Sequence, residues 1–168
     1  MKRLRALVAP LAAALCACSA PKAPDAAPGT SLIENFSMAG VNATPSRWRL
    51  KALTARMEEK RGLMFFTAPD VKFYDGNALS SEITSLNGKL LMREKDAELT
   101  GSVHVDSRKD GMTMDTTVLY FSTARNKIWT KEPVLIHRGR TIITGRDFTA
   151  NPDLSEIEIR HQETHINK

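Results

Sequence analysis

Short hydrophobic segments, separated by turn signals, run through most of this chain and restrict it to an antiparallel β-fold. The clearest of them spans residues 97–106. There, one face carries Ala97, Leu99, Gly101, Val103 and Val105, and polar residues occupy the positions between them. A period of two over a segment of this length is typical of a β-strand with one buried face. We therefore expect residues 97–106 to form a strand that contributes to the core.

Turn signals recur at short intervals after Trp48. The dipeptides concerned are Asp75-Gly76, Asn87-Gly88, Asp110-Gly111, Arg125-Asn126, Arg138-Gly139 and Asn151-Pro152. Asn-Gly and Asp-Gly readily adopt the positive φ angles that tight hairpin turns require. Many short strands joined by such turns predict an all-β domain, which could be a sandwich, a barrel or an open β-fold.

The segments between these turns differ in how clearly they predict strands. Residues 113–122 are strand-rich in composition, and their alternation slips between Thr116 and Leu119, which indicates a β-bulge. Residues 133–137, 141–150 and 154–161 continue the series of strands.

For one segment, the sequence does not decide between a strand and a helix. Residues 50–60 are rich in good helix formers, and propensity alone favours a helix there. However, Trp48, Leu50 and Ala52 alternate with basic residues, and this pattern favours the start of a strand.

The N-terminus has the pattern of an export signal. Residues 1–5 are basic and residues 6–15 are apolar, but this run is shorter than the roughly twenty residues that a membrane-spanning helix needs. Leu15 and Ala17 stand at positions −3 and −1 before Cys18, and this arrangement resembles a bacterial lipobox. That resemblance implies a lipid anchor on the Cys18 thiol. An ordinary signal, cleaved after Ala17 or Ala20, is the alternative.

The leader divides the chain into three predicted parts. Residues 1–18 form the signal peptide with its lipobox, residues 19–30 a Pro/Ala-rich tether, and residues 31–168 a single β-domain. The leader contains three basic residues and no acidic one, so its removal lowers the formal charge from +5 to about +2. The high isoelectric point is therefore weak evidence for nucleic acid, which we do not expect as a partner. Both cysteines lie in the leader region, so the β-domain needs no disulfide.

The sequence offers no constellation of catalytic or metal-binding residues. The segment 161–165 reads His-Gln-Glu-Thr-His, but a zinc protease needs Glu directly after the first His. Here Glu163 comes one position too late. His104 lies on the polar face of the best strand and has no cysteine near it, and the chain has no Gly-x-Ser-x-Gly motif and no phosphate-binding glycine loop. We therefore predict no enzymatic activity, no metal site and no cofactor.

Several motifs together resemble one protein family. The segments are Leu99-Thr100-Gly101-Ser102-Val103-His104-Val105, then Asp110-Gly111, Thr116-Thr117-x-Leu119-x-Phe121, Ile128-x-Thr130-x-x-Pro133-Val134-x-Ile136 and Ile143-Thr144-Gly145-x-x-Phe148. Phe65-Phe66-Thr67-x-Pro69-x-Val71-x-Phe73 and Trp48-x-Leu50-x-Ala52 extend the pattern towards the N-terminus. Over residues 47–160 the order and spacing resemble the periplasmic domain of the LptC family of lipopolysaccharide-export proteins and its OstA-like relatives.

That resemblance implies both a fold and a function. The fold would be a twisted, open β-jelly roll of antiparallel strands, also described as a β-taco, with a groove that receives the acyl chains of lipopolysaccharide. The partners would be the subunits of an inner-membrane ABC exporter at one edge and an LptA-like periplasmic bridge protein at the other. Because the exporter's ATPase supplies the energy, the resemblance implies no catalytic residue in this chain.

The groove candidates are the apolar residues expected to face the interior of this fold. They are Phe66, Phe73, Leu99, Val103, Val105, Leu119, Phe121, Ile143 and Phe148. For each of them, a place in a closed hydrophobic core is the alternative to contact with lipid.

The predicted lipid anchor does not by itself determine which membrane holds the protein. It also departs from the usual pattern, because LptC proteins usually have an N-terminal transmembrane helix. Ser19 follows Cys18 where the familiar sorting rule has Asp for retention at the inner membrane, so that rule points to the outer membrane. An exporter as partner favours the inner membrane, and we expect a periplasmic protein anchored there. Two functions remain: a lipid-transfer module, or an assembly lipoprotein that pairs its β-edges with partners around a filled core.

Overall fold

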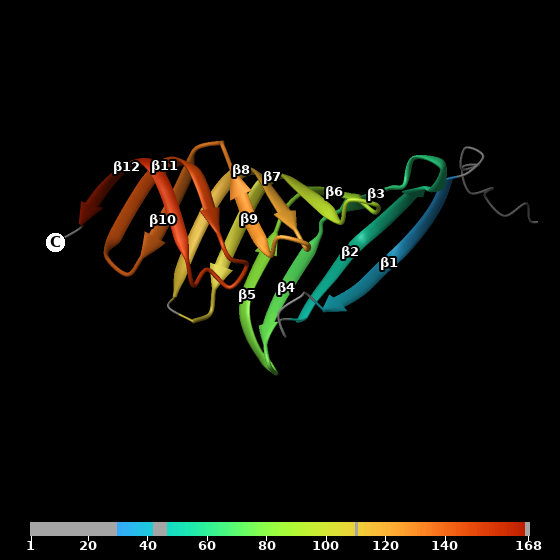
Figure 1. Cartoon of the computed structure of the whole chain (residues 1–168), viewed down its shortest axis with the longest axis horizontal. Coiled ribbons are helices and arrows are strands. Elements are labelled where there is room, and N and C mark those ends of the chain that lie inside the picture. The colour runs from blue at the N-terminus through green and yellow to red at the C-terminus, as the bar shows by residue number, and fades with distance from the viewer. Residues whose placement is uncertain (1–29, 42–46, 110, 167–168) are drawn as a thin grey trace, which may run out of the picture.

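The computed structural model describes residues 30–41, 47–109 and 111–166, and it confirms the predicted all-β class. Every strand pairing in this part of the chain is antiparallel. The strands are β1 (Thr30–Val41), β2 (Arg47–Glu58), β3 (Leu63–Thr67), β4 (Asp70–Asp75), β5 (Ala78–Thr84), β6 (Asn87–Leu91), β7 (Asp96–Ser107), β8 (Met112–Ser122), β9 (Lys127–Thr130), β10 (Val134–Arg138), β11 (Thr141–Ala150) and β12 (Ile157–Ile166). They cross an elongated molecule from β1 at one end to β12 at the other (Figure 1). Within these ranges, no helix is sufficiently long and apolar to cross a membrane.

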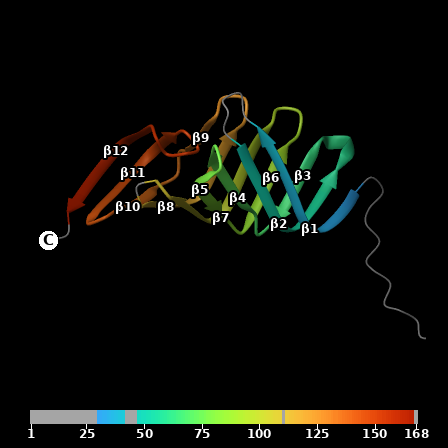
Figure 2. The same ribbon diagram turned by 90° about the horizontal axis from the view of Figure 1, so that it is seen from below.

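Long strands shared by two walls organise the molecule. Residues 47–51 of β2 pair with β4, whereas residues 54–58 pair with β3. In β7, residues 104–107 pair with β5, and residues 96–100 pair with β6. One half of each long strand therefore belongs to a first wall with β4 and β5, and the other half to a second wall with β3 and β6 (Figure 2).

The same arrangement repeats in the C-terminal half. β8 and β11 each pair with β10 in the first wall and with β9 in the second. The pairings enclose two compartments: an N-terminal one bounded by β2, β3, β6, β7, β5 and β4, and a C-terminal one bounded by β8, β9, β11 and β10. In the described part of the chain, β1 pairs with β2 alone and β12 with β11 alone. Each of them therefore has an unpaired edge, and the fold is an open jelly roll rather than a closed barrel.

A row of irregular residues marks where the chain passes from one wall to the other. Ala68, Ser102, Asp147 and His161 all have positive φ, and each lies between a segment of the first wall and a segment of the second. Few residues other than glycine adopt such φ angles. Their occurrence at the same place in several strands indicates that the fold itself requires a bend between the two walls. We call this row the bend line.

The bulge predicted from the slip in residues 116–119 occurs at this bend line. The β7–β8 register shifts where Thr100 pairs with Val118 and Val103 pairs with Thr116. The extra residue therefore lies on β7, where Gly101 has a φ of 77°, and not on β8, where the alternation slips.

The ambiguous segment 50–60 is mostly strand. β2 includes its first nine residues, and a short 3₁₀ turn (Glu59–Arg61) follows. The backbone of β2 pairs with β1 on one edge and with β3 and β4 on the other. These ladders, together with the burial of Leu50, Ala52 and Ala55, override the local helix propensity.

Most of the predicted turns are present, with one correction. Gly76, Gly111 and Gly139 adopt positive φ between strands, as expected. Asn87-Gly88, however, starts β6 instead of forming a turn. A Cβ atom at Gly88 would lie 3.2 Å from the side chain of Leu99 and 3.3 Å from that of Phe66, so this glycine allows the close approach of neighbouring strands. The last strand also begins at Ile157, later than the predicted residue 154.

Candidate functional site

A cavity of about 560 Å³ occupies the N-terminal compartment between the two walls. Its volume lies within the range of small-molecule binding pockets. Most of its lining is hydrophobic, and polar or charged groups are few. The lining residues are Met38, Gly40, Trp48, Leu50, Met64, Phe66, Val71, Phe73, Ile83, Lys89, Leu90, Met92, Lys95, Ala97, Leu99, Phe121, Thr123 and Ala124.

The alternation of each strand places these side chains inside. Met64 and Phe66 face inward from β3, and Val71 and Phe73 face inward from β4, because residues two apart share one face of a strand. Phe73 packs edge-on against Phe121 of β8, with their ring centroids 5.1 Å apart. This geometry is favourable for aromatic pairs and stabilises the cavity wall.

The predicted groove residues divide between this cavity and the closed core. The cavity is lined by Phe66, Phe73, Leu99 and Phe121. Fully buried positions outside its lining are held by Val103, Val105, Leu119 and Phe148. Ile143 is half-buried and packs against the core from β11.

The C-terminal compartment is filled by side chains. Met114, Leu119, Ile128, Ile136 and Phe148 converge there from four strands, and none is more than 1% exposed. The loop after β11 is also packed against the protein: Pro152 and Leu154 are buried, and the Pro152 carbonyl accepts a hydrogen bond from the Ser81 hydroxyl of β5.

Sequence reasoning missed several residues that line the cavity, and a signal for most of them was available. Leu50, Met64 and Val71 lie two residues from Trp48, Phe66 and Phe73, so the period of two places each on the inward face. Met38 comes from β1, for which no strand was predicted.

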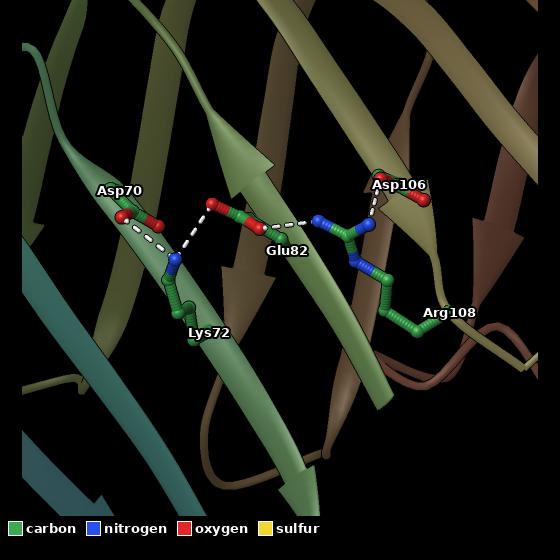
Figure 3. Close-up of polar contacts among 5 residues, drawn as sticks. All are labelled: Asp70, Lys72, Glu82, Asp106 and Arg108. Carbon is green, nitrogen blue, oxygen red and sulfur yellow. Dashed lines mark hydrogen bonds and ion pairs between the residues drawn. The ribbon is translucent and has the colours of Figure 1, made fainter. Parts of the chain in front are cut away.

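An ion-pair ladder stabilises the first wall beside the cavity. Lys72 of β4 contacts Asp70 at 3.3 Å and Glu82 of β5 at 2.8 Å. Arg108, just beyond β7, contacts Glu82 at 3.1 Å and Asp106 at 3.3 Å (Figure 3). Glu82 and Asp106 are cross-strand neighbours, so Arg108 offsets a repulsion between like charges.

These contacts shift the pKa values of the ladder in a definite direction. The hydrogen bond from Lys72, assisted by Arg108, lowers the pKa of Glu82 below its ordinary value. The hydrogen bond to Glu82 in turn raises the pKa of Lys72. Unfolding at acid pH must therefore protonate Glu82, whose contribution to stability is complete above about pH 4.5 and is lost as the pH falls through the lowered value.

We expect Glu82→Gln to lower the free energy of unfolding at pH 7 by about 1 kcal/mol. Its stability should also depend less on pH below about 4.5, because the shifted carboxylate is gone. Chemical denaturation from pH 3 to pH 7 measures both effects. Glu132→Gln, at an exposed carboxylate without an ion pair in the described chain, is the control. An unchanged pH profile for Glu82→Gln would contradict the assignment.

The histidines do not form a metal centre in the described residues. His161 and His165 are exposed on β12, and the nearest carboxylate to His165 is that of Glu163, at 4.0 Å. His104 contacts Asp115 at 2.7 Å on the exposed face of β7. Within the described ranges, no three His, Cys, Asp or Glu side chains are grouped so that they could hold a metal ion.

Comparisons with known proteins agree with this architecture. Residues 10–167 match the family model described as "Lipopolysaccharide-assembly, LptC-related". Among solved structures, the chain is similar to LptH from Pseudomonas aeruginosa, described as the LptA-homologous periplasmic component of the lipopolysaccharide transport device. That match has 12% sequence identity and a TM-score of 0.55, and it covers 72% of this chain and 95% of LptH. A search of curated proteins finds no match.

The family match covers nearly the whole chain and confirms the resemblance inferred from the strand motifs. The similarity to LptH confirms the open jelly-roll fold. LptC-related proteins are non-enzymatic components of lipopolysaccharide transport. This chain therefore belongs to the LptC-related family of lipopolysaccharide-assembly proteins.

Proposed function

We propose that the chain is a periplasmic, membrane-anchored module that receives lipopolysaccharide from an inner-membrane ABC exporter and passes it to an LptA-like bridge protein. The apolar cavity of about 560 Å³ in the N-terminal compartment is the observation that carries this proposal. Transfer of a methylene group from water into such a site is worth about 0.8 kcal/mol. A cavity lined by aromatic and aliphatic side chains can therefore hold an acyl chain without any specific polar contact.

Photo-crosslinking in living cells tests this function directly. A photoreactive residue at Leu99 or Phe66, which line the cavity, should give a lipopolysaccharide adduct. The same residue at Val105, which is fully buried outside the cavity, should give none. Val105 is a matched control because it lies on the same strand as Leu99. Equal labelling at all three positions, or at none, would contradict a lipid site in the cavity.

The anchor is the second part of the proposal. Cys18 lies outside the described residues, so its support is the lipobox pattern of the sequence. Two acyl chains hold a protein stably on a membrane, whereas one chain does not. Lipidation of Cys18 would therefore keep the β-domain at the membrane surface.

We expect Cys18→Ala to release the protein into the soluble periplasmic fraction or to leave its precursor unprocessed. Fractionation and the mobility of the mature band measure both results. Cys16→Ala should behave like the wild type, since Cys16 has Ala13 at position −3 and makes a poorer lipobox. If Cys18→Ala is processed and fractionates as before, the lipobox assignment is wrong.

A role in assembly without lipid transfer is the alternative, and the free strand edges favour it. β1 and β12 each pair on one edge within the described chain, and an open edge can accept a strand from a partner. In the proposed arrangement, the β1 end meets the exporter and the β12 end meets the bridge protein. Absence of lipid from every crosslink, together with intact partner binding, would favour this alternative.

A further inference from the structure

Three turns of the second wall lie side by side at one end of the cavity. They follow β2 (residues 59–62), β6 (residues 92–95) and β8 (residues 123–126). The Met92 amide donates a hydrogen bond to the Gly62 carbonyl at 3.0 Å, and the Thr123 amide donates one to the Lys95 carbonyl at 3.2 Å. Met92, Lys95 and Thr123 also line the cavity. The three turns thus form a continuous ridge at the cavity, which we call the turn ridge.

The turn ridge is rich in positive charge. Its cations are Lys60, Arg61, Arg93, Lys95 and Arg125, and its carboxylates are Glu59 and Glu94. Two of the arginines are already engaged: Arg61 pairs with Glu58 at 3.0 Å, and Arg125 pairs with Asp96 at 3.6 Å. Among the described residues, the Lys95 ammonium has no ion-pair or hydrogen-bond partner. Of these cations, only Lys95 belongs to the cavity lining.

The backbone of Lys95 is held in a conformation that a lysine rarely adopts. Its φ is 58°, in the left-handed region that favours glycine or asparagine. Its amide donates to the Leu91 carbonyl at 2.8 Å, and its own carbonyl accepts from the Thr123 amide and hydroxyl. A strained residue held so firmly beside a cavity indicates a use for its side chain, because glycine would fit this turn with less strain.

We propose that Lys95 binds the phosphate headgroup of a lipid whose acyl chain occupies the cavity. This inference rests on the proposed lipid-binding function and adds the chemical class and orientation of the lipid. An apolar cavity with an unpaired cation at one end complements an amphiphile with an anionic head. A charge-assisted hydrogen bond from the ammonium to a phosphate oxygen keeps the head at the turn ridge while the chain extends between the walls.

Tryptophan quenching by brominated lipids tests the assignment on the full chain. The chain has two tryptophans, Trp48 and Trp129, and Trp48 lines the cavity. In a Trp129→Phe background, Trp48 is therefore the sole source of tryptophan fluorescence and reports on the cavity. The probes are a phosphatidic acid and a diacylglycerol with the same dibrominated chains, each delivered in the same non-ionic detergent. The phosphatidic acid should bind about fivefold more tightly, and this preference should shrink as salt is raised.

Three variants distinguish an effect of the Lys95 side chain on lipid binding from an effect on protein stability. Lys95→Glu should abolish the preference for phosphatidic acid while binding of the diacylglycerol remains. Lys95→Gly should also abolish it, with an unchanged or raised melting temperature, because glycine adopts positive φ without strain. Lys131→Glu makes the same charge change at an exposed lysine between β9 and β10 and should keep the full preference.

The outcomes distinguish this inference from the proposed function. Equal binding of both lipids by the wild type, or an unchanged preference in Lys95→Glu, would overturn the role of Lys95 and leave the cavity as a lipid site. Absence of quenching by either lipid would overturn both. Inorganic phosphate at the concentration of the lipid should not displace the phosphatidic acid. Displacement would identify a site for a free anion and overturn the headgroup assignment.

Discussion

Replacing Val103 with arginine should prevent the protein from folding. Val103 is 1% exposed on β7 and lies outside the cavity lining, so a guanidinium there would be buried without a partner. Such a buried charge destabilises by roughly 4 kcal/mol or more, a large part of the 5–15 kcal/mol that stabilises a typical domain. Circular dichroism and thermal melting of Val103→Arg would show the loss of a cooperative transition.

The neighbouring strand provides a matched control for this result. Val118 of β8 is half-buried on the outer face, from which an arginine can extend its charged end into water. Val118→Arg should therefore fold and melt within a few degrees of the wild type. A folded Val103→Arg protein that loses lipopolysaccharide transfer would show instead that this position opens into the groove.

Replacing Ala97 with tryptophan should block lipid capture and leave the fold intact. Ala97 is half-buried on β7 and lines the cavity, so an indole ring can extend into space that protein atoms leave empty. We expect lipopolysaccharide crosslinking at Phe66 to fall by about tenfold, because the ring occupies volume that an acyl chain needs. The melting temperature should stay the same or rise, since the ring buries apolar surface.

Ala55 is the control for the size of the substitution. It is fully buried on β2 and does not line the cavity, so a tryptophan there would overpack the core. Ala55→Trp should lower the free energy of unfolding by about 3 kcal/mol. If Ala97→Trp destabilised the protein as much as Ala55→Trp, the space beside Ala97 would be closed core. Normal lipid capture by a stable Ala97→Trp protein would place the acyl chain elsewhere.

Local patterns in the sequence were sufficient for the fold class. Alternation over residues 97–106 predicted β7, and Gly76, Gly111 and Gly139 mark real turns. Both signals are local, because strand alternation and turn conformation depend on neighbouring residues. Where a local preference competed with strand pairing, pairing decided the outcome. Residues 50–58 are strand despite their helix propensity, and Asn87-Gly88 is strand because Gly88 packs between Leu99 and Phe66.

The sequence by itself determined the all-β class, the family and, through the alternation of the strands, which candidate residues face the interior. This alternation could not distinguish a cavity from a closed core, since Leu99 and Val103 share one face of the same strand. The tertiary structure made that distinction: Leu99 lines the cavity between the two walls, whereas Val103 lies beyond the bend line and is fully buried. The separation between the walls depends on pairings between residues distant in the chain, and no local pattern encodes such a distance.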